Sequence, residues 1–125
     1  GGIDADAVTL LGSAPSGFAV LAGEDAVASA MLAVGAVGAI MASAHVCTSQ
    51  YAALVRAWLD GDARRARPLG HQLAALSVAL FAEPNPTVIK AVLHARGLIA
   101  TPDVRLPLLP ASPETTAAAQ AIAAG

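Results

Sequence analysis

Residues 17–46 read GFAVLAGEDAVASAMLAVGAVGAIMASAHV, and this stretch decides the fold. It contains two short apolar runs, at 18–22 and 37–42, each with the length of a strand that is buried on both faces. Between the two runs, the acidic pair Glu24 and Asp25 opens a predicted helix. A strand, a helix and a second strand joined by short connections are typical of a parallel βαβ unit with a right-handed crossover.

Helices are predicted on both sides of this unit. Residues 4–11 favour a short helix before it, and Thr48 or Ser49 caps the helix that follows. That second helix carries apolar side chains at the i, i+3, i+4, i+7 and i+8 positions counted from Tyr51. Further along the chain, the sequence pattern predicts helices at 62–81, 86–96 and 113–124.

Prolines mark where these later helices start or are interrupted. Pro68 lies inside the predicted helix 62–81, where an interior proline costs roughly 3 kcal/mol, so we expect a kink or a fresh start there. Asn85 is expected to cap the next helix, with Pro86 at its first position. Ser112 repeats this arrangement before the last helix.

Composition excludes several classes of protein. Of the 125 residues, 56% are hydrophobic and 13% are charged, which excludes a disordered polar tail. Seven basic and nine acidic residues give a net charge of -2, and this balance excludes a protein that binds nucleic acid by neutralising phosphates. The single cysteine, Cys47, forbids an intrachain disulfide and fits a reducing compartment, so we expect a cytoplasmic protein.

A long uncharged stretch raises the question of a membrane span. Residues 26–44 carry no charge, but most of them are Ala, Gly or Ser, which contribute little transfer free energy. No Lys or Arg flanks either end, and no Trp or Tyr lies at a boundary. We therefore expect a buried globular segment and no association with a membrane.

The predicted sheet is incomplete. Two parallel strands that are buried on both faces need a neighbouring strand at each outer edge, yet no further strand is evident after residue 44. The chain also begins with Gly1 and Gly2 rather than with methionine. We therefore expect it to be the end of a larger parallel α/β structure.

Four segments of the sequence carry recognisable motifs: GFAVLAGED (17–25), GAVGAIMASAHV (35–46), EPNPTVIK (83–90), and GLI with RLPLLP (97–110). In order and spacing they resemble the dihydrodipicolinate synthase and N-acetylneuraminate lyase family. The segments correspond to a strand with its sGdD turn, the last strand of the barrel, the EPNP segment of the helical domain, and the RLPL stretch near the family's end. The EPNP and RLPLLP motifs favour the dihydrodipicolinate synthase branch.

The resemblance implies an α/β fold that is the C-terminal portion of a TIM (β/α)8 barrel. Residues 1–60 would hold the last two strands and their helices, and residues 61–125 a C-terminal helical domain. Enzymes of this family are class I aldolase-type lyases: a lysine forms a Schiff base with pyruvate, and the enamine attacks an aldehyde. In the dihydrodipicolinate synthase branch the aldehyde is aspartate semialdehyde and the pathway leads to lysine and diaminopimelate. The family analogy also implies a homotetramer and no separate cofactor.

The Schiff-base lysine is expected to lie outside this chain. The resemblance places it on the sixth barrel strand, just before the segment that matches Gly1 and Gly2. The only lysine here, Lys90, matches a structural lysine after EPNP and lies in a predicted helix rather than in a desolvated pocket. We therefore expect no catalytic residue in this chain, and no activity from the chain alone.

The site residues that the resemblance implies lie at the ends of the two predicted strands. The C-terminal ends of barrel strands face the active site. Gly23 and Ile40 match family positions that line the pocket and approach bound pyruvate, so both are expected to bind substrate. Asp25, Ser43 and His45 are candidates for the rim of that pocket. His45 stands where many relatives have asparagine, which leaves the identity of the aldehyde open.

Other interpretations of these residues compete with a role in the site. Glu24 and Asp25 favour capping of the following helix. His45 and Cys47 together supply too few ligands for a metal, so no metal site is expected. Tyr51 and Trp58 share a helical stripe that is typical of a core. Arg64, Arg67 and the neighbouring arginine at 65 form a charged face that is solvated or lies at a subunit contact.

Two other functions remain open at this point. One is a different pyruvate lyase of the family, either a 2-keto-3-deoxy acid aldolase or an N-acetylneuraminate lyase. The other is a non-catalytic helical interaction module.

Overall fold

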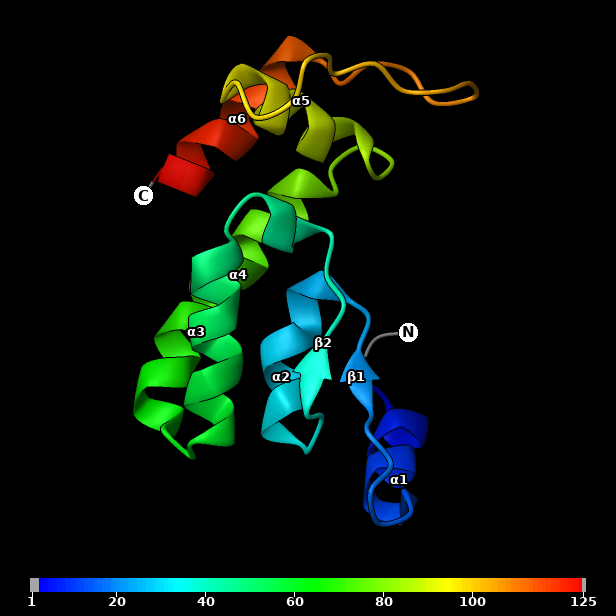
Figure 1. Cartoon of the computed structure of the whole chain (residues 1–125), viewed down its shortest axis with the longest axis vertical. Helices are drawn as coiled ribbons and strands as arrows, with labels where there is room; N and C mark the ends of the chain where they lie inside the picture. The colour runs from blue at the N-terminus through cyan, green and yellow to red at the C-terminus, as the bar shows by residue number, and fades with distance from the viewer. Residues whose placement is uncertain (1–2, 125) are drawn as a thin grey trace.

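Helices make up most of the chain, and a short parallel pair of strands lies between them (Figure 1). The structure is a computed structural model and describes residues 3–124. Within that range, no helix is both long enough and apolar enough to cross a membrane. The elements are α1 (Ala5–Ser13), β1 (Leu21–Ala22), η1 (Asp25–Val27), α2 (Ala28–Ala33), β2 (Gly38–Ala39), η2 (Ser43–His45), α3 (Thr48–Leu59), α4 (Ala63–Leu80), α5 (Thr87–Ala95) and α6 (Pro113–Ala124).

The predicted strand–helix–strand order is confirmed. β1 pairs in parallel with β2, with Leu21 opposite Gly38 and Ala22 opposite Ala39, and α2 forms the connection between them. The strands are shorter than the apolar runs suggested. Burial on both faces was also a wrong prediction, because Ala22 is 1% exposed whereas Leu21 is 47% exposed. Within residues 3–124 the sheet holds only these two strands, so no third strand covers an outer edge.

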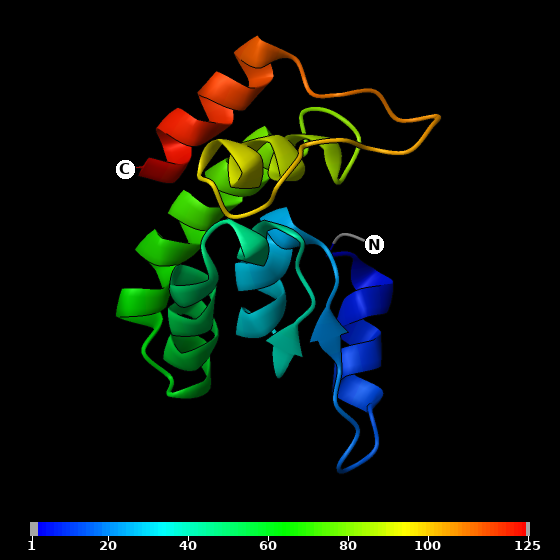
Figure 2. The same ribbon diagram turned by 45° about the horizontal axis from the view of Figure 1, so that its top comes forward.

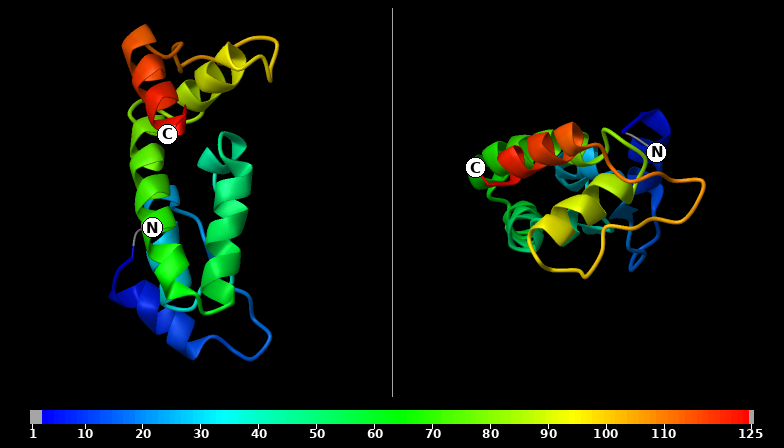
Figure 3. Two further views of the ribbon diagram at one scale, coloured as in Figure 1. Left: turned by 90° about the vertical axis from the view of Figure 1, so that its left-hand side faces the viewer. Right: turned by 90° about the horizontal axis from the view of Figure 1, so that it is seen from above.

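The helices that follow supply most of the large side chains of the core, which they share with β1 and α2. α3 and α4 run side by side in opposite directions, and Gly61 turns the chain between them with a φ of 75° (Figure 3). α6 packs against α4, and α5 packs against α6, at the upper end of the molecule in Figure 2. Tyr51 is 2% exposed, which confirms it as core, while Trp58 is only half-buried and donates a hydrogen bond to Ser29. The other large side chains at the centre of this core are Leu54, Leu73, Leu76, Leu80, Val88 and Val92.

α4 continues through its proline. The helix is unbroken from Ala63–Leu80 with Pro68 inside it, so the predicted fresh start is wrong, while a kink stays a prediction. Pro68 lies in the second turn, where a proline removes the hydrogen bond to the carbonyl four residues earlier. The buried stripe on both sides of Pro68, from Ala66 to Leu80, keeps the helix in place through packing.

Helix capping follows the predictions only in part. Ser112 Oγ accepts the Thr115 N–H at 3.1 Å, which confirms it as the cap of α6. Neither Thr48 nor Ser49 caps α3, since the helix already begins at Thr48 and its Cys47 cap makes no side-chain hydrogen bond.

The start of α5 also differs from the prediction. Pro86 itself occupies the cap position, and no side chain caps the helix there, so the prediction that Asn85 is the cap is wrong. The Thr87 N–H donates to the Pro84 carbonyl at 3.0 Å, which turns the chain one residue later than the sequence suggested.

Candidate functional site

A hydrogen bond to a buried carboxylate joins the segments that follow β1 and β2. Asp25 follows β1 and is 7% exposed, and Ser43 follows β2 and is fully buried. The Ser43 N–H donates to Asp25 Oδ2 at 2.6 Å. Such charge-assisted bonds are short and stronger than neutral ones. The prediction that Asp25 caps the following helix is therefore wrong, because its side chain accepts the Ser43 N–H at the start of η2 instead.

Glu24 does not act as a capping side chain either. It occupies the cap position of η1, but its carboxylate makes no capping hydrogen bond and is exposed. Because η1 is a single 3-10 turn that leads into α2, the geometry that suits a capping carboxylate at an α-helix start is missing.

The two residues expected to bind substrate lie at the same edge of the sheet. Gly23 directly follows β1 and is exposed, and Ile40 directly follows β2 and is 73% exposed. The Ile40 N–H donates to the Ala22 carbonyl at 2.8 Å, so the backbone next to Gly23 holds the backbone of Ile40. His45 belongs to η2 together with Ser43, but its side chain is exposed rather than part of the buried contact.

A second buried polar contact, which the sequence did not predict, lies between α3 and α4. Tyr51 and Ser77 place their hydroxyl oxygens 2.6 Å apart, and both residues are almost fully buried. Both hydroxyls also reach the Leu73 carbonyl, Ser77 Oγ at 2.8 Å and the Tyr51 phenol at 3.3 Å. No periodic signal pairs a tyrosine with a serine 26 positions away, so this contact follows from the tertiary fold.

The carboxylate of Asp25, near the strand ends, also affects the pKa of the Tyr51 phenol. Burial raises the pKa of Tyr51 above its ordinary value of 10.0, the hydrogen bond with Ser77 acts in the opposite direction, and the charge of Asp25 adds to the increase. Four buried residues from η1, η2, α3 and α4 therefore form one polar region, in which the strand ends meet the helical core: Asp25, Ser43, Tyr51 and Ser77.

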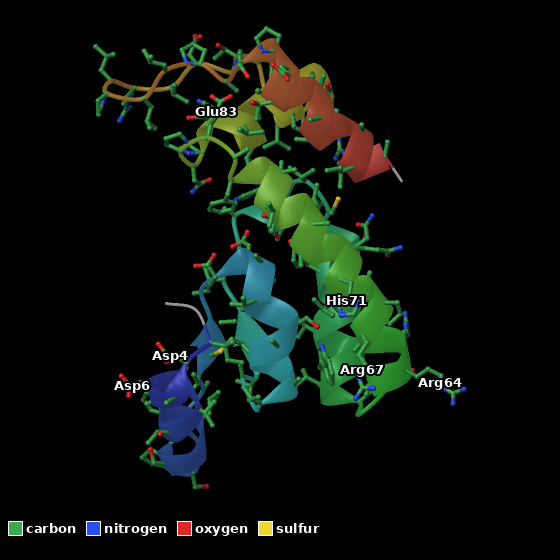
Figure 4. All side chains as sticks on the ribbon, turned by 180° about the vertical axis from the view of Figure 1, so that it is seen from behind. Asp4, Asp6, Arg64, Arg67, His71 and Glu83 are labelled. Carbon is green, nitrogen blue, oxygen red and sulfur yellow. The ribbon has the colours of Figure 1, made fainter. Side chains whose placement is uncertain are left out.

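The other polar candidates lie away from the strand ends. Lys90 on α5 is half-exposed, and its ammonium donates to the Asp103 carbonyl, which fits a structural role. Figure 4 shows Arg64 and Arg67 on α4, and both side chains are exposed, in keeping with a solvated face. Within residues 3–124, no group of three His, Cys, Asp or Glu side chains is arranged to hold a metal.

The chain belongs to the Dihydrodipicolinate synthetase family, whose sequence profile matches residues 4–124. Among curated relatives, it is 40% identical over 112 residues to the 4-hydroxy-tetrahydrodipicolinate synthase of Leptothrix cholodnii. That match covers 90% of this chain and 38% of the relative, so the chain spans less than two fifths of the relative's length.

Solved structures of similar proteins agree with this assignment. The 4-hydroxy-tetrahydrodipicolinate synthase of Methylacidiphilum fumariolicum SolV matches with a TM-score of 0.87 and 32% identity, over 95% of this chain and 40% of that one. The dihydrodipicolinate synthase of Acinetobacter baumannii, solved in complex with pyruvate, matches with a TM-score of 0.85 and 29% identity, over 94% of this chain and 41% of that one.

Proposed function

We propose that this chain is the C-terminal part of a 4-hydroxy-tetrahydrodipicolinate synthase, a lyase that condenses pyruvate with aspartate semialdehyde in lysine and diaminopimelate biosynthesis. The observation that carries the proposal is the parallel pair of strands with Gly23 and Ile40 at its C-terminal edge. The names of the curated relatives support the choice of reaction.

In the proposed reaction this chain binds pyruvate but does not react with it. A lysine outside the chain loses its proton, attacks the pyruvate carbonyl and expels water to form the Schiff base. The Schiff base loses a methyl proton, and the resulting enamine attacks the aldehyde carbon while the aldehyde oxygen takes up a proton and becomes a hydroxyl. The amine of the aspartate semialdehyde part then attacks the Schiff-base carbon and displaces the lysine, which is regenerated. The backbone at Gly23 and Ile40 forms one wall of the pyruvate site, because both stand at the end of a strand and face outward.

The exposed sheet supports the proposal that further barrel units cover it. Phe18 is 62% exposed and Leu21 is 47% exposed, although both belong to the apolar run that forms β1. Exposed strand edges with apolar side chains associate with other strands. In the proposed enzyme, six preceding (β/α) units close the barrel around β1 and β2. The family analogy implies that the enzyme is a cytoplasmic homotetramer. The chain alone is inactive.

Two alternatives have an observation in their favour. His45 occupies a position where many family members have asparagine, and it is exposed at the strand ends, which favours a different aldehyde in a related pyruvate lyase. Leu54 and Leu80 are fully buried among the helices, which favours a non-catalytic helical interaction module.

The proposal is tested by joining this chain to the N-terminal segment of a related synthase. The 125 residues are fused behind the segment of the Leptothrix cholodnii synthase that precedes its matched region. The fusion protein should consume pyruvate when aspartate semialdehyde is present, and the chain alone should not. Turnover with N-acetylmannosamine or a sugar-acid aldehyde instead would favour the related lyases. A folded fusion protein that turns over none of these aldehydes would overturn the proposal.

A further inference from the structure

We propose that Asp25 is a positioning residue for the pyruvate site. Its carboxylate fixes the backbone between Ile40 and Ser43 by accepting the Ser43 N–H. This inference rests on the proposed function, because that function places bound pyruvate beside Ile40.

The backbone from Ile40 to Ser43 is held at one end by β1 and at the other by a residue that follows β1. At one end, the Ile40 N–H donates to the Ala22 carbonyl at 2.8 Å. At the other end, the Ser43 N–H donates to Asp25 Oδ2 at 2.6 Å. Between these two bonds the segment has left the β2 ladder, which ends at Ala39. The hydrogen bond to Asp25 therefore holds this backbone beyond the last residue of β2, where pairing between the strands no longer does so.

The energetics of Asp25 argue against a role in stability alone. A carboxylate that is only 7% exposed loses most of its hydration, and one amide partner compensates for only part of that loss. Among the described residues, the Ser43 N–H is the hydrogen-bond donor recorded for this side chain. The hydrogen bonds of Tyr51, the nearby phenol, are made with Ser77 and the Leu73 carbonyl rather than with Asp25. We therefore explain the carboxylate by the geometry that it imposes on the backbone between β2 and η2.

A direct contact with substrate would give a different result from a positioning role. If Asp25 held pyruvate only through the Ile40 backbone, its removal would weaken pyruvate binding and leave the aldehyde's KM unchanged. If Asp25 touched the aldehyde, its removal would raise the KM of the aldehyde. A purely structural role would lower the melting temperature and leave both KM values as they were.

The test uses the fusion protein described above, with Asp25→Ala, Asp25→Asn and a matched control. We expect Asp25→Ala to raise the KM for pyruvate about tenfold, the loss expected for one hydrogen bond to a charged group. Asp25→Asn keeps an acceptor oxygen at the same place, so it should recover most of that loss. The KM for aspartate semialdehyde should stay unchanged in both variants.

Asp62→Ala is the matched control, because Asp62 Oδ1 also accepts a backbone N–H, that of Arg65 at 3.0 Å, but at the start of α4. It should lower the melting temperature without changing the KM for pyruvate. An unchanged pyruvate KM in Asp25→Ala, or an effect confined to the aldehyde, would overturn the inference. If Asp25→Ala does not fold, an Asp25→Asn variant with the full pyruvate defect would overturn it as well.

The two proposals fail in different ways. A fusion protein that keeps Asp25 and turns over none of the tested aldehydes contradicts the proposed function, and the positioning role falls with it. An active fusion protein in which Asp25 variants behave like Asp62→Ala contradicts only the positioning role.

Discussion

The strand-bearing region, residues 3–46, and the helical region, residues 47–124, bury very different side chains. In the strand-bearing region the residues buried most deeply are small, such as Ala22 and Ala28, and α1 buries none of its residues. In the helical region, α3, α4 and α5 bury large side chains completely, among them Leu54 and Leu80. The two regions share one apolar core, but the helical region fills it with large side chains and the strand-bearing region mainly with small ones.

Leucine truncations should show the largest difference between the two regions. Leu80→Ala in α4 removes a fully buried side chain, so the free energy of unfolding should fall by about 2–5 kcal/mol. Leu21→Ala in β1 removes a side chain that is 47% exposed, and the loss should be about 1 kcal/mol. Urea denaturation of the two variants measures both values.

The same two leucine variants can be compared in the fusion protein. If preceding barrel units cover β1, the loss for Leu21→Ala should rise toward that for Leu80→Ala when both are measured in the fusion protein. Equal losses in the isolated chain would contradict the contrast between the regions.

Two glycine variants compare a close contact between the regions with an open position in α1. A Cβ at Gly70 in α4 would lie 2.2 Å from Ser29 Oγ of α2, so Gly70→Ala should destabilise the chain by about 1–3 kcal/mol. A Cβ at Gly12 in α1 meets nothing within 4 Å, so Gly12→Ala should stabilise it by up to about 1 kcal/mol. Thermal unfolding reports both changes, and Ser29→Gly should restore part of the stability lost in Gly70→Ala. A neutral Gly70→Ala variant would contradict the close packing of α2 on α4.

Tyr51→Phe tests the polar region where the two regions meet. Loss of the phenol's hydrogen bond to Ser77 should reduce the free energy of unfolding at neutral pH by about 1 kcal/mol. The raised pKa of Tyr51 means that the folded state holds the phenolic proton more tightly than the unfolded state does. Stability is therefore complete below pH 10.0 and is lost as the pH rises through the folded pKa. The alkaline decline in stability should be shallower in Tyr51→Phe, and equal slopes would contradict the raised pKa.

Glu83 should give the smallest effect, and it belongs to the helical region alone. Its carboxylate accepts the Ser112 N–H at 3.0 Å, and this bond lowers the pKa of Glu83 below its ordinary value of 4.5. The resulting stability is present above pH 4.5 and is lost as the pH falls through the lower folded pKa. In Glu83→Gln, the free energy of unfolding should fall less steeply as the pH drops below 4.5. An equal fall in the free energy of unfolding at acid pH in the variant and in the original chain would argue against this contact.

Local signals predicted much of the fold. The glycine after α3 and the serine before α6, Gly61 and Ser112, mark helix ends in the sequence and do so in the structure. The order of strands and helices followed from the two apolar runs and the spacing of apolar residues between them.

What the sequence could not predict depends on contacts across the chain. Pro68 stays within an unbroken helix because tertiary packing on both sides of it outweighs a local penalty. Asp25 carries every local sign of a helix cap, but its partner is an amide 18 positions away. The exposure of β1 depends on neighbouring strands and not on its own apolar residues, so a run that is typical of a buried strand is half-exposed.

The central claim is that this chain forms part of a pyruvate site whose reactive lysine lies elsewhere. Borohydride reduction in the presence of pyruvate, followed by peptide mass spectrometry, tests it on the chain alone and on the fusion protein. The account predicts a covalent pyruvate adduct in the fusion protein, on a lysine of the added segment, and none on the chain alone. An adduct on Lys90, or no adduct in a folded fusion protein, would contradict it.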